Sequence, residues 1–215
     1  GRRGRGGIDG NGKAPMKNVI FDLGAVLIEW DPTLAFADIF TTREAAEDWL
    51  ARIDFHSWNR FQDGGRSFQD GLAVARAGHG DEIRHLEGYL DAFPLTIDTP
   101  VPGTWEIAEA LLARGVPLYA ITNWSAETWP HALALYPRLE TIFNDIVVSG
   151  QVKQLKPAAA IYRLLMDRNG LEAGDCIFID DSMANVEGAR AVGMDAIHFT
   201  GAEALGRELA ARGLL

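Results

Sequence analysis

Asp22 is the first residue of the chain whose type and position could carry chemistry. It follows a short apolar run at 18–21, and Gly24 comes two residues later in a loop. Open α/β sheets bind their ligands at the carboxyl ends of such strands. A buried carboxylate is costly unless it pairs with a positive group or binds a cation. Taken alone, Asp22 also fits an ordinary helix-capping or turn aspartate.

Three further polar segments stand at the exit of an apolar run or at the start of a predicted helix. They are Thr122-Asn123, Lys156-Pro157 and Asp180-Asp181. Thr, Lys and Asp commonly end strands or cap helices, so each of these segments alone indicates little. With Asp22 they make four polar segments in one order along the chain, and this order favours a common site where the strands end.

The elements that must position these side chains alternate between strand-like and helix-like patterns from Met16 onward. Alternation of this kind predicts an α/β fold, with a parallel sheet covered by helices on both faces. We expect strands near 18–21, 117–121, 145–148, 176–180 and 195–199. We expect helices near 104–114, 126–135, 158–168, 183–192 and 202–212.

The alternation fails between Asp31 and about Thr99. Helix-like segments occur near 33–40, 43–52, 67–77 and 82–92, without a convincing strand. The pattern predicts a helical subdomain inserted between the first and second strands. The aromatic and polar stretch 55–63 interrupts the helical period. It either faces the site, with Trp58 as a substrate contact, or simply connects two helices through core aromatics.

The four polar segments resemble the motifs of the haloacid dehalogenase-like (HAD) hydrolase superfamily. The matching residues are 21–27, 121–123, 155–157 and 178–185, and the resemblance runs from about Met16 to the C-terminus. It is closest to subfamily IA, in which a small helical cap follows the first motif. The resemblance implies a Rossmann-like core domain at 16–31 and 99–215. It also implies a cap domain at 32–98 that closes over the substrate and excludes water.

The same resemblance implies a Mg²⁺-dependent phosphatase. Asp22 would be the nucleophile that forms an aspartyl-phosphate, and Lys156 would supply positive charge to the phosphate. The Thr122 hydroxyl and backbone amides around Asn123 would donate to phosphate oxygens. The expected metal ligands are Asp22, Asp181 and the Gly24 carbonyl, and the expected supporting residues are Asp180 and Asn185. Because neighbouring side chains alternate in a strand, we expect only one of the two adjacent aspartates to face the ion.

Gly24 departs from the usual family pattern. In most HAD phosphatases an aspartate at this position protonates the leaving oxygen and later activates water, and such help is typically worth about 10²–10⁴-fold. A branch with an Asp-x-Gly first motif resembles this segment, including residues 29–32, and some of its members look like glucose-1-phosphate phosphatases. We therefore expect a small phosphorylated metabolite, such as a sugar phosphate, as substrate. The candidates to replace the missing aspartate are Asp31, His56 and Asp63.

Two other functions compete with a phosphatase. A 2-haloacid dehalogenase would use the same aspartate to displace halide from carbon, without a metal. Dehalogenases of the family carry a tyrosine at the position of Gly24, so this match is poorer. A non-catalytic binding module would explain the missing acid–base residue. The presence of Asp22, Lys156 and Asp181 argues against it.

The composition bears on partners and on location. The chain of 215 residues has a formal net charge of −10, and residues 16–215 carry 16 basic and 29 acidic side chains. An acidic surface repels nucleic acid and anionic membranes, so we expect neither partner. The single cysteine, Cys176, suits a reducing compartment, and we expect a cytoplasmic monomer or homodimer. Residues 1–15 are glycine-rich and basic, and we expect a disordered or expression-derived tail outside the fold.

Overall fold

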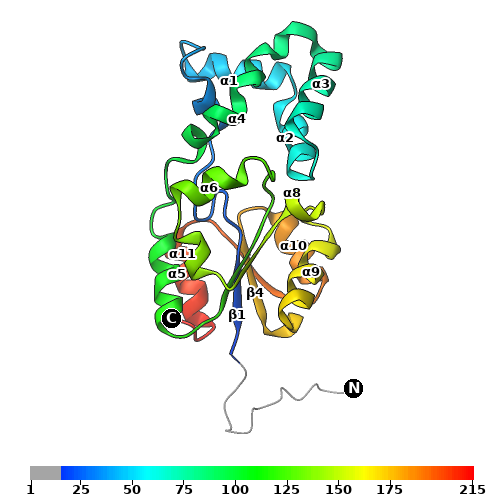
Figure 1. Cartoon of the computed structure of the whole chain (residues 1–215). Helices are drawn as coiled ribbons and strands as arrows, with labels where there is room; N and C mark the ends of the chain where they lie inside the picture. The colour runs from blue at the N-terminus through cyan, green and yellow to red at the C-terminus, as the bar shows by residue number, and fades with distance from the viewer. Residues whose placement is uncertain (1–15) are drawn as a thin grey trace.

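The computed structural model describes residues 16–215, so the predicted tail at 1–15 lies outside the described residues. Its centre is a parallel sheet of five strands in the order β3-β2-β1-β4-β5 (Figure 1). The strands are β1 Asn18–Phe21, β2 Leu118–Thr122, β3 Asp145–Val148, β4 Cys176–Asp180 and β5 Asp195–His198. The predicted α/β fold with a parallel sheet is confirmed. Each strand lies within one residue of its predicted bounds.

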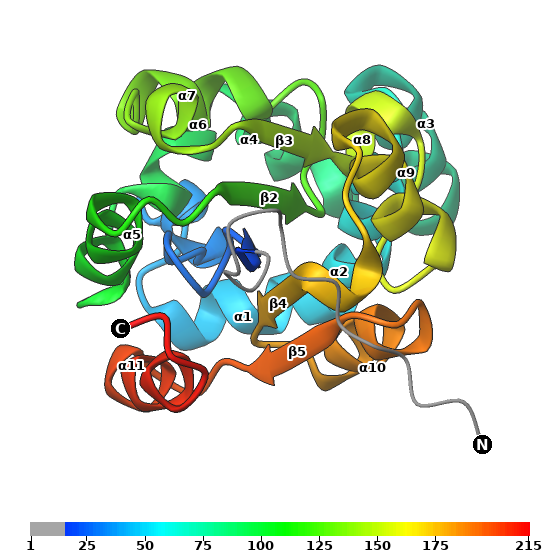
Figure 2. The same cartoon turned by 90° about the horizontal axis from the view of Figure 1, so that it is seen from below.

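Helices cover both faces of the sheet, which explains why its inner strands are continuously apolar. Every residue of β2 and β4 is buried. Along β1 the side chains alternate: Val19 and Phe21 join one core cluster, and Ile20 joins the other. The first cluster receives α5 Thr104–Ala113 and α11 Ala202–Ala211, and the second receives α9 Ala159–Asn169 and α10 Met183–Ala191 (Figure 2).

The remaining helices of this part are α6 Trp129–Leu135, α7 Leu139–Ile142, α8 Ser149–Val152 and the 3-10 turn η4 Ala173–Asp175. The sequence pattern did not indicate α7, α8 or η4. Segments of three or four residues are too short to show a helical period.

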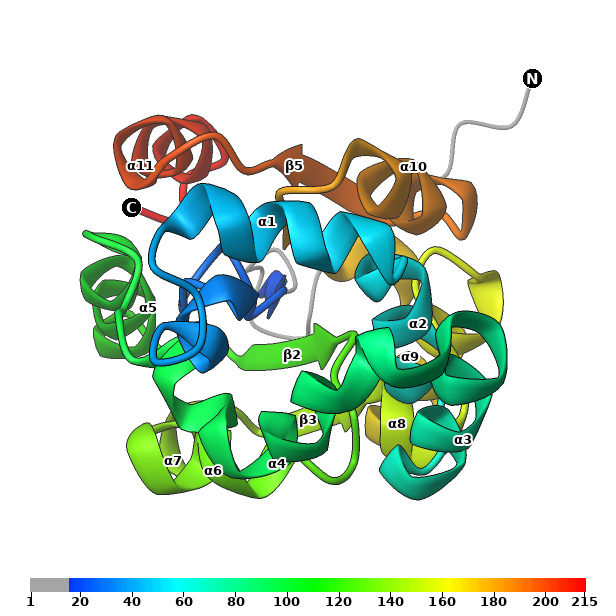
Figure 3. The same ribbon diagram turned by 90° about the horizontal axis from the view of Figure 1, so that it is seen from above.

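All elements between β1 and β2 are helical, and we call residues 32–97 the helical insertion. It consists of η1 Pro32–Phe36, α1 Arg43–Arg52, α2 Phe55–Asp63, α3 Phe68–His79, η2 Gly80–Gly88, α4 Tyr89–Ala92 and η3 Phe93–Ile97. Figures 1 and 3 show the insertion above the carboxyl ends of the strands. This edge of the sheet is where the predicted site residues were expected to gather.

The stretch 55–63 is a helix, so the interpretation that it merely connects two helices was wrong, although the core aromatics of that interpretation are confirmed in Phe55 and Trp58. Phe55, Trp58 and Gln62 are its buried residues, and their spacing places them along one face of α2. Gln62 is polar and therefore interrupts the apolar pattern of this face, so the sequence did not indicate that the face is buried. Its side-chain amide donates to the backbone carbonyls of Arg66 and Ser67, which satisfies it inside the insertion.

Two backbone segments join the insertion to the sheet, and they run side by side. The amide of Glu29 donates to the Thr99 carbonyl, and the amide of Val101 donates to the Leu27 carbonyl, both at 2.9 Å. This pairing fixes where the insertion leaves and re-enters the core. None of the helices within residues 16–215 has both the length and the apolarity to cross a membrane.

Candidate active site

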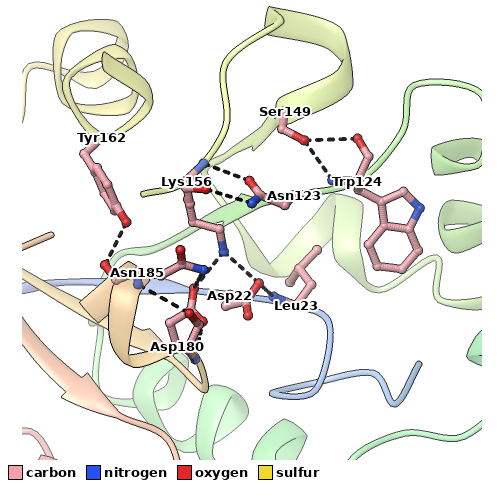
Figure 4. Close-up of polar contacts among 10 residues, drawn as sticks. Asp22, Leu23, Asn123, Trp124, Ser149, Lys156, Tyr162, Asp180 and Asn185 are labelled. Atoms are coloured by element: carbon pink, nitrogen blue, oxygen red, sulfur yellow. Dashed lines mark hydrogen bonds and ion pairs between the residues drawn. The ribbon is translucent and has the colours of Figure 1, made fainter. Parts of the chain in front are cut away.

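The end of β1 and the end of β4 bring two carboxylates to one buried lysine. The Lys156 ammonium lies 2.9 Å from Asp22 Oδ1 and 2.8 Å from Asp180 Oδ2 (Figure 4). The lysine side chain is 1% exposed, and it reaches the strands from the loop between α8 and α9. β1 and β4 are adjacent in register, with Phe21 beside Ile179, so the residues that follow them meet.

Asp180 is held by several donors at once. Besides Lys156, its Oδ2 accepts from the Asn185 side chain at 3.1 Å, and its Oδ1 accepts from the Ser182 amide at 2.9 Å. Ser182 in turn caps α10 through its hydroxyl. Both oxygens of Asp180 are therefore engaged, and one of them holds the Lys156 ammonium. Asn185 supports Asp180 and makes no hydrogen bond to the lysine within the described residues.

Asn123 fixes the backbone of Lys156. Its side-chain oxygen accepts from the Lys156 amide at 2.9 Å, and its side-chain nitrogen donates to the Lys156 carbonyl at 3.1 Å. Arg60 of the helical insertion donates to the same carbonyl at 3.2 Å. The lysine is therefore positioned from the end of β2, from β4 and from the insertion together.

The site holds more negative than positive charge. Burial raises the pKa of Asp22 well above its ordinary value, and Lys156 opposes the rise while the charges of Asp180 and Asp181 add to it. Burial acts against ionisation of Asp180 too, but Lys156 outweighs it and lowers the pKa of that carboxyl. Burial and the charge of Asp180 raise the pKa of Asp181. One buried ammonium does not balance three carboxyl groups, so the site favours a second cation.

Asp22, Asp180 and Asp181 each bring one oxygen within 4.8 Å of the others. Asp181 can join this group because β4 ends at Asp180 and the chain bends away, so strand alternation does not extend to it. Asp22 Oδ1 accepts from the Leu23 amide and from Lys156, which leaves Oδ2 for a ligand. One or two carboxylates with carbonyls and waters suit Mg²⁺, so these residues fit such an ion.

A cavity of about 240 Å³ lies over this cluster, between the ends of the strands and the helical insertion. Its lining includes the predicted residues Asp22, Gly24, Asn123, Lys156, Asp181 and Asn185. The insertion and the segments near it contribute Trp30, Asn59, Asp63 and Phe93, and the loop after β2 contributes Trp124 and Thr128. The cavity is small and is formed jointly by the core and the insertion.

Two predicted substrate contacts do not line this cavity. Trp58 is buried inside the insertion, where its Nε1 donates to the Gly71 carbonyl at 2.7 Å. Its large apolar ring packs against Phe55, Phe68 and Tyr89, which corrects its assignment as a substrate contact. Thr122 is 1% exposed at the end of β2, and the cavity lining begins at the next residue.

The three candidates for the missing acid–base group differ in position. Asp31 caps η1 and pairs with Arg43, and despite partial burial these partners lower its pKa. His56 is exposed and packs edge-on against Trp30. Only Asp63 lines the cavity.

Sequence reasoning missed some of the lining residues because they come from the insertion. Phe93 and Asn59 belong to helices whose patterns gave no sign of which residues face the sheet. Trp30 belongs to residues 29–32, which resemble the Asp-x-Gly branch, and this resemblance could have indicated that Trp30 lies near the site. Trp124 is 6% exposed, and it both packs in the core and lines the cavity.

Comparison with known proteins agrees with this geometry. The chain is 28% identical over 201 residues to the sesquiterpene phosphatase of Aspergillus oryzae, across 90% of this chain and 95% of that protein. It is 32% identical over 197 residues to a phosphoglycolate phosphatase of Rhodospirillum rubrum, across 84% of this chain and 78% of that protein.

A solved structure shares the fold. It is a HAD family enzyme of Bacteroides thetaiotaomicron, in complex with magnesium and inorganic phosphate, with a TM-score of 0.64 and 19% sequence identity. The match covers 87% of this chain and 96% of that one. The family model for haloacid dehalogenase-like hydrolases matches residues 16–193, from two residues before β1 to the turn after α10. That span includes every element that builds the site, and the chain therefore belongs to the haloacid dehalogenase-like hydrolases.

Proposed function

We propose that the protein is a Mg²⁺-dependent phosphomonoester hydrolase that acts through an aspartyl-phosphate on Asp22. The observation that carries this proposal is the pairing of Asp22 with Lys156 at the floor of the cavity, beside the carboxylate of Asp181. Asp22 keeps one oxygen available to attack, and Lys156 lies close enough to neutralise phosphoryl oxygens. A Mg²⁺ ion held by Asp22, Asp181 and the Gly24 carbonyl would add the charge neutralisation that phosphoryl transfer needs.

Asn185 and Asp180 act in this proposal as supports for Lys156. The backbone amide of Asn123 remains our candidate to donate to the phosphate, because Asn123 follows β2 and lines the cavity. The Thr122 hydroxyl is a weaker candidate, because Thr122 is 1% exposed and does not line the cavity. Two relatives of the chain are phosphatases, a sesquiterpene phosphatase and a phosphoglycolate phosphatase, and they support phosphate-ester hydrolysis as the reaction.

We further propose that residues 32–98 form a cap domain of the subfamily IA type, with 16–31 and 99–215 as the core. The cavity lies between these two parts, so closure of the cap would exclude water from the reacting phosphate. The substrate we propose is a small phosphorylated metabolite such as a sugar phosphate. Asn59 and Asp63 offer hydrogen bonds to hydroxyl groups, and Trp30, Phe93 and Trp124 offer apolar faces to a sugar ring.

A panel of phosphate esters and 2-haloacids, each with Mg²⁺ and with EDTA, tests this function. We expect phosphate release that requires Mg²⁺ and no halide release. Sustained chloride release from 2-chloropropionate in EDTA would favour a dehalogenase instead. No turnover of either class would favour a binding module.

A further inference from the structure

We propose that Asp63, at the end of α2 in the helical insertion, is the acid–base residue of this phosphatase. This inference rests on the proposed function. An alkyl phosphate releases a poor leaving group, and the departing oxygen needs a proton. Gly24 has no side chain to give one, so the proton must come from another group in the cavity.

Few titratable groups within residues 16–215 line the cavity, and they are Asp22, Asp63, Lys156 and Asp181. Asp22 is the proposed nucleophile. Lys156 is locked between Asp22 and Asp180, and although burial disfavours its charge, these two carboxylates raise its pKa. Asp181 belongs to the carboxylate cluster that fits a cation. Asp63 is the group that remains.

Contacts between the insertion and the core hold Asp63 in place. The Ser149 hydroxyl donates to the Asp63 carbonyl at 2.6 Å, and the same hydroxyl accepts from the Trp124 amide at 2.9 Å. One turn earlier in α2, Arg60 donates to the Lys156 carbonyl at 3.2 Å. The end of α2 is therefore fastened to Lys156 directly and to Trp124 through Ser149, and both Lys156 and Trp124 line the cavity.

The position also suits the direction of the reaction. Asp22 approaches from the ends of the strands, and the attacking and leaving oxygens of a phosphoryl transfer are roughly in line. The leaving oxygen therefore faces the helical insertion, the part of the molecule that carries Asp63. The water that later attacks the aspartyl-phosphate enters from that same side. One residue can thus serve both steps.

The protonation state of Asp63 fits the first step. Burial raises the pKa of its carboxyl to about 8, although the charges of Arg60 and Lys156 and the Ser125 amide oppose the rise. The Asn59 side chain lies 3.4 Å from its Oδ2. At neutral pH the carboxyl therefore holds a proton to give.

The protons and bonds balance across the two steps. As the bond from Asp22 to phosphorus forms and the ester P–O bond breaks, Asp63 gives its proton to the leaving oxygen and becomes a carboxylate. Water then attacks phosphorus and the acyl-phosphate bond breaks. Asp63 takes a proton from that water and is again protonated. Inorganic phosphate is released, and the Asp22 carboxylate is regenerated.

The test compares Asp63→Asn with wild type on a primary alkyl phosphate and on p-nitrophenyl phosphate. With the alkyl phosphate, we expect the variant to lose about 10²–10⁴-fold in kcat. With p-nitrophenyl phosphate, whose leaving group needs no proton, we expect the first burst of p-nitrophenolate at the wild-type rate. Turnover after the burst should be slow, because the water step has lost its base.

Asp70→Asn is the matched control, because Asp70 is an exposed aspartate of α3 in the same insertion and lines none of the site. It should behave as wild type. A second variant, Gly24→Asp in the Asp63→Asn background, should restore alkyl phosphate turnover. A Cβ built on Gly24 meets no atom within 4 Å and its φ is not positive, so neither a clash at Cβ nor backbone strain opposes a side chain there.

Two results would overturn the inference. One is an Asp63→Asn enzyme that turns over the alkyl phosphate at the wild-type rate. The other is a burst that slows as much as alkyl phosphate turnover, since a structural role for Asp63 would impair both. If the proposed function itself is wrong, the result is different: the wild-type protein would release no phosphate from any ester.

Discussion

Replacement of Lys156 by methionine tests how the site is held together. Methionine has a similar length and no charge, so the change leaves the carboxylates of Asp22 and Asp180 buried without their cation. Removing one partner of a buried ion pair typically costs about 3–5 kcal/mol, because the remaining charge stays unpaired. For a chain of this size, each kcal/mol lowers Tm by roughly 2–4 °C, so we expect a drop of roughly 6–20 °C.

The destabilisation should depend on pH. The pKa of Asp180 is lowered in the folded protein, so its ion pair stabilises the fold above the ordinary Asp pKa of about 3.9 and is lost as pH falls through the folded value. In Lys156→Met both buried carboxyls favour the protonated form, so lowering the pH removes their unpaired charge and reduces the destabilisation of the variant. We expect a large stability difference from wild type near pH 7, and a smaller one toward pH 4.

Urea unfolding at several pH values measures this difference. Lys153→Met is the matched control, because Lys153 is an exposed lysine just before the same loop and forms no ion pair within the described residues. It should change the stability little at any pH. A Lys156→Met variant that is as stable as Lys153→Met near pH 7 would refute the reasoning, since the two buried carboxylates would then not depend on the ammonium.

Four further predictions follow from the site. Asp22→Asn should abolish phosphate release while circular dichroism stays that of wild type. Mg²⁺ at about 100 times its Kd should stabilise the fold by about 2.7 kcal/mol, measured as a rise in Tm over EDTA, and Asp181→Asn should reduce that rise. Turnover of an alkyl phosphate should fall as pH rises through about 8, where Asp63 loses its proton, and Asp63→Asn should lack this limb. Asp31→Asn should leave kcat unchanged, because its side chain caps η1 and pairs with Arg43 outside the cavity.

The sheet could be predicted from the sequence because its inner strands are buried on both faces and its strands are followed by turn or polar residues. The same pattern placed Asp22, Asn123, Lys156 and Asp181 near one another, since parallel strands end at a common edge. The helical insertion was harder. Which face of α2 points inward depends on its packing against α1 and α3, and Gln62 hid the buried face because its partners are carbonyls from a later turn.

Two residues of the helical insertion show most clearly what could not be predicted from the sequence. Trp58 was predicted to contact the substrate because tryptophan often does so. In the structure its indole packs against aromatic neighbours and donates a hydrogen bond to the Gly71 carbonyl instead. Asp63 was one of three candidates for the missing acid–base group, and nothing in the sequence ranked it above Asp31 or His56. Its place in the cavity comes from the contact of its carbonyl with Ser149, which lies 86 residues away in the chain. No local pattern encodes a contact over that separation.

The central claim is that phosphate is transferred to Asp22, and acid quenching during turnover measures this directly. Enzyme mixed with p-nitrophenyl phosphate and Mg²⁺ would be stopped within the burst, digested and analysed by mass spectrometry. We predict a phosphoryl group on the peptide that contains Asp22, which disappears when the reaction is allowed to finish. Release of inorganic phosphate over the same interval, with Asp22 unmodified throughout, would contradict the account.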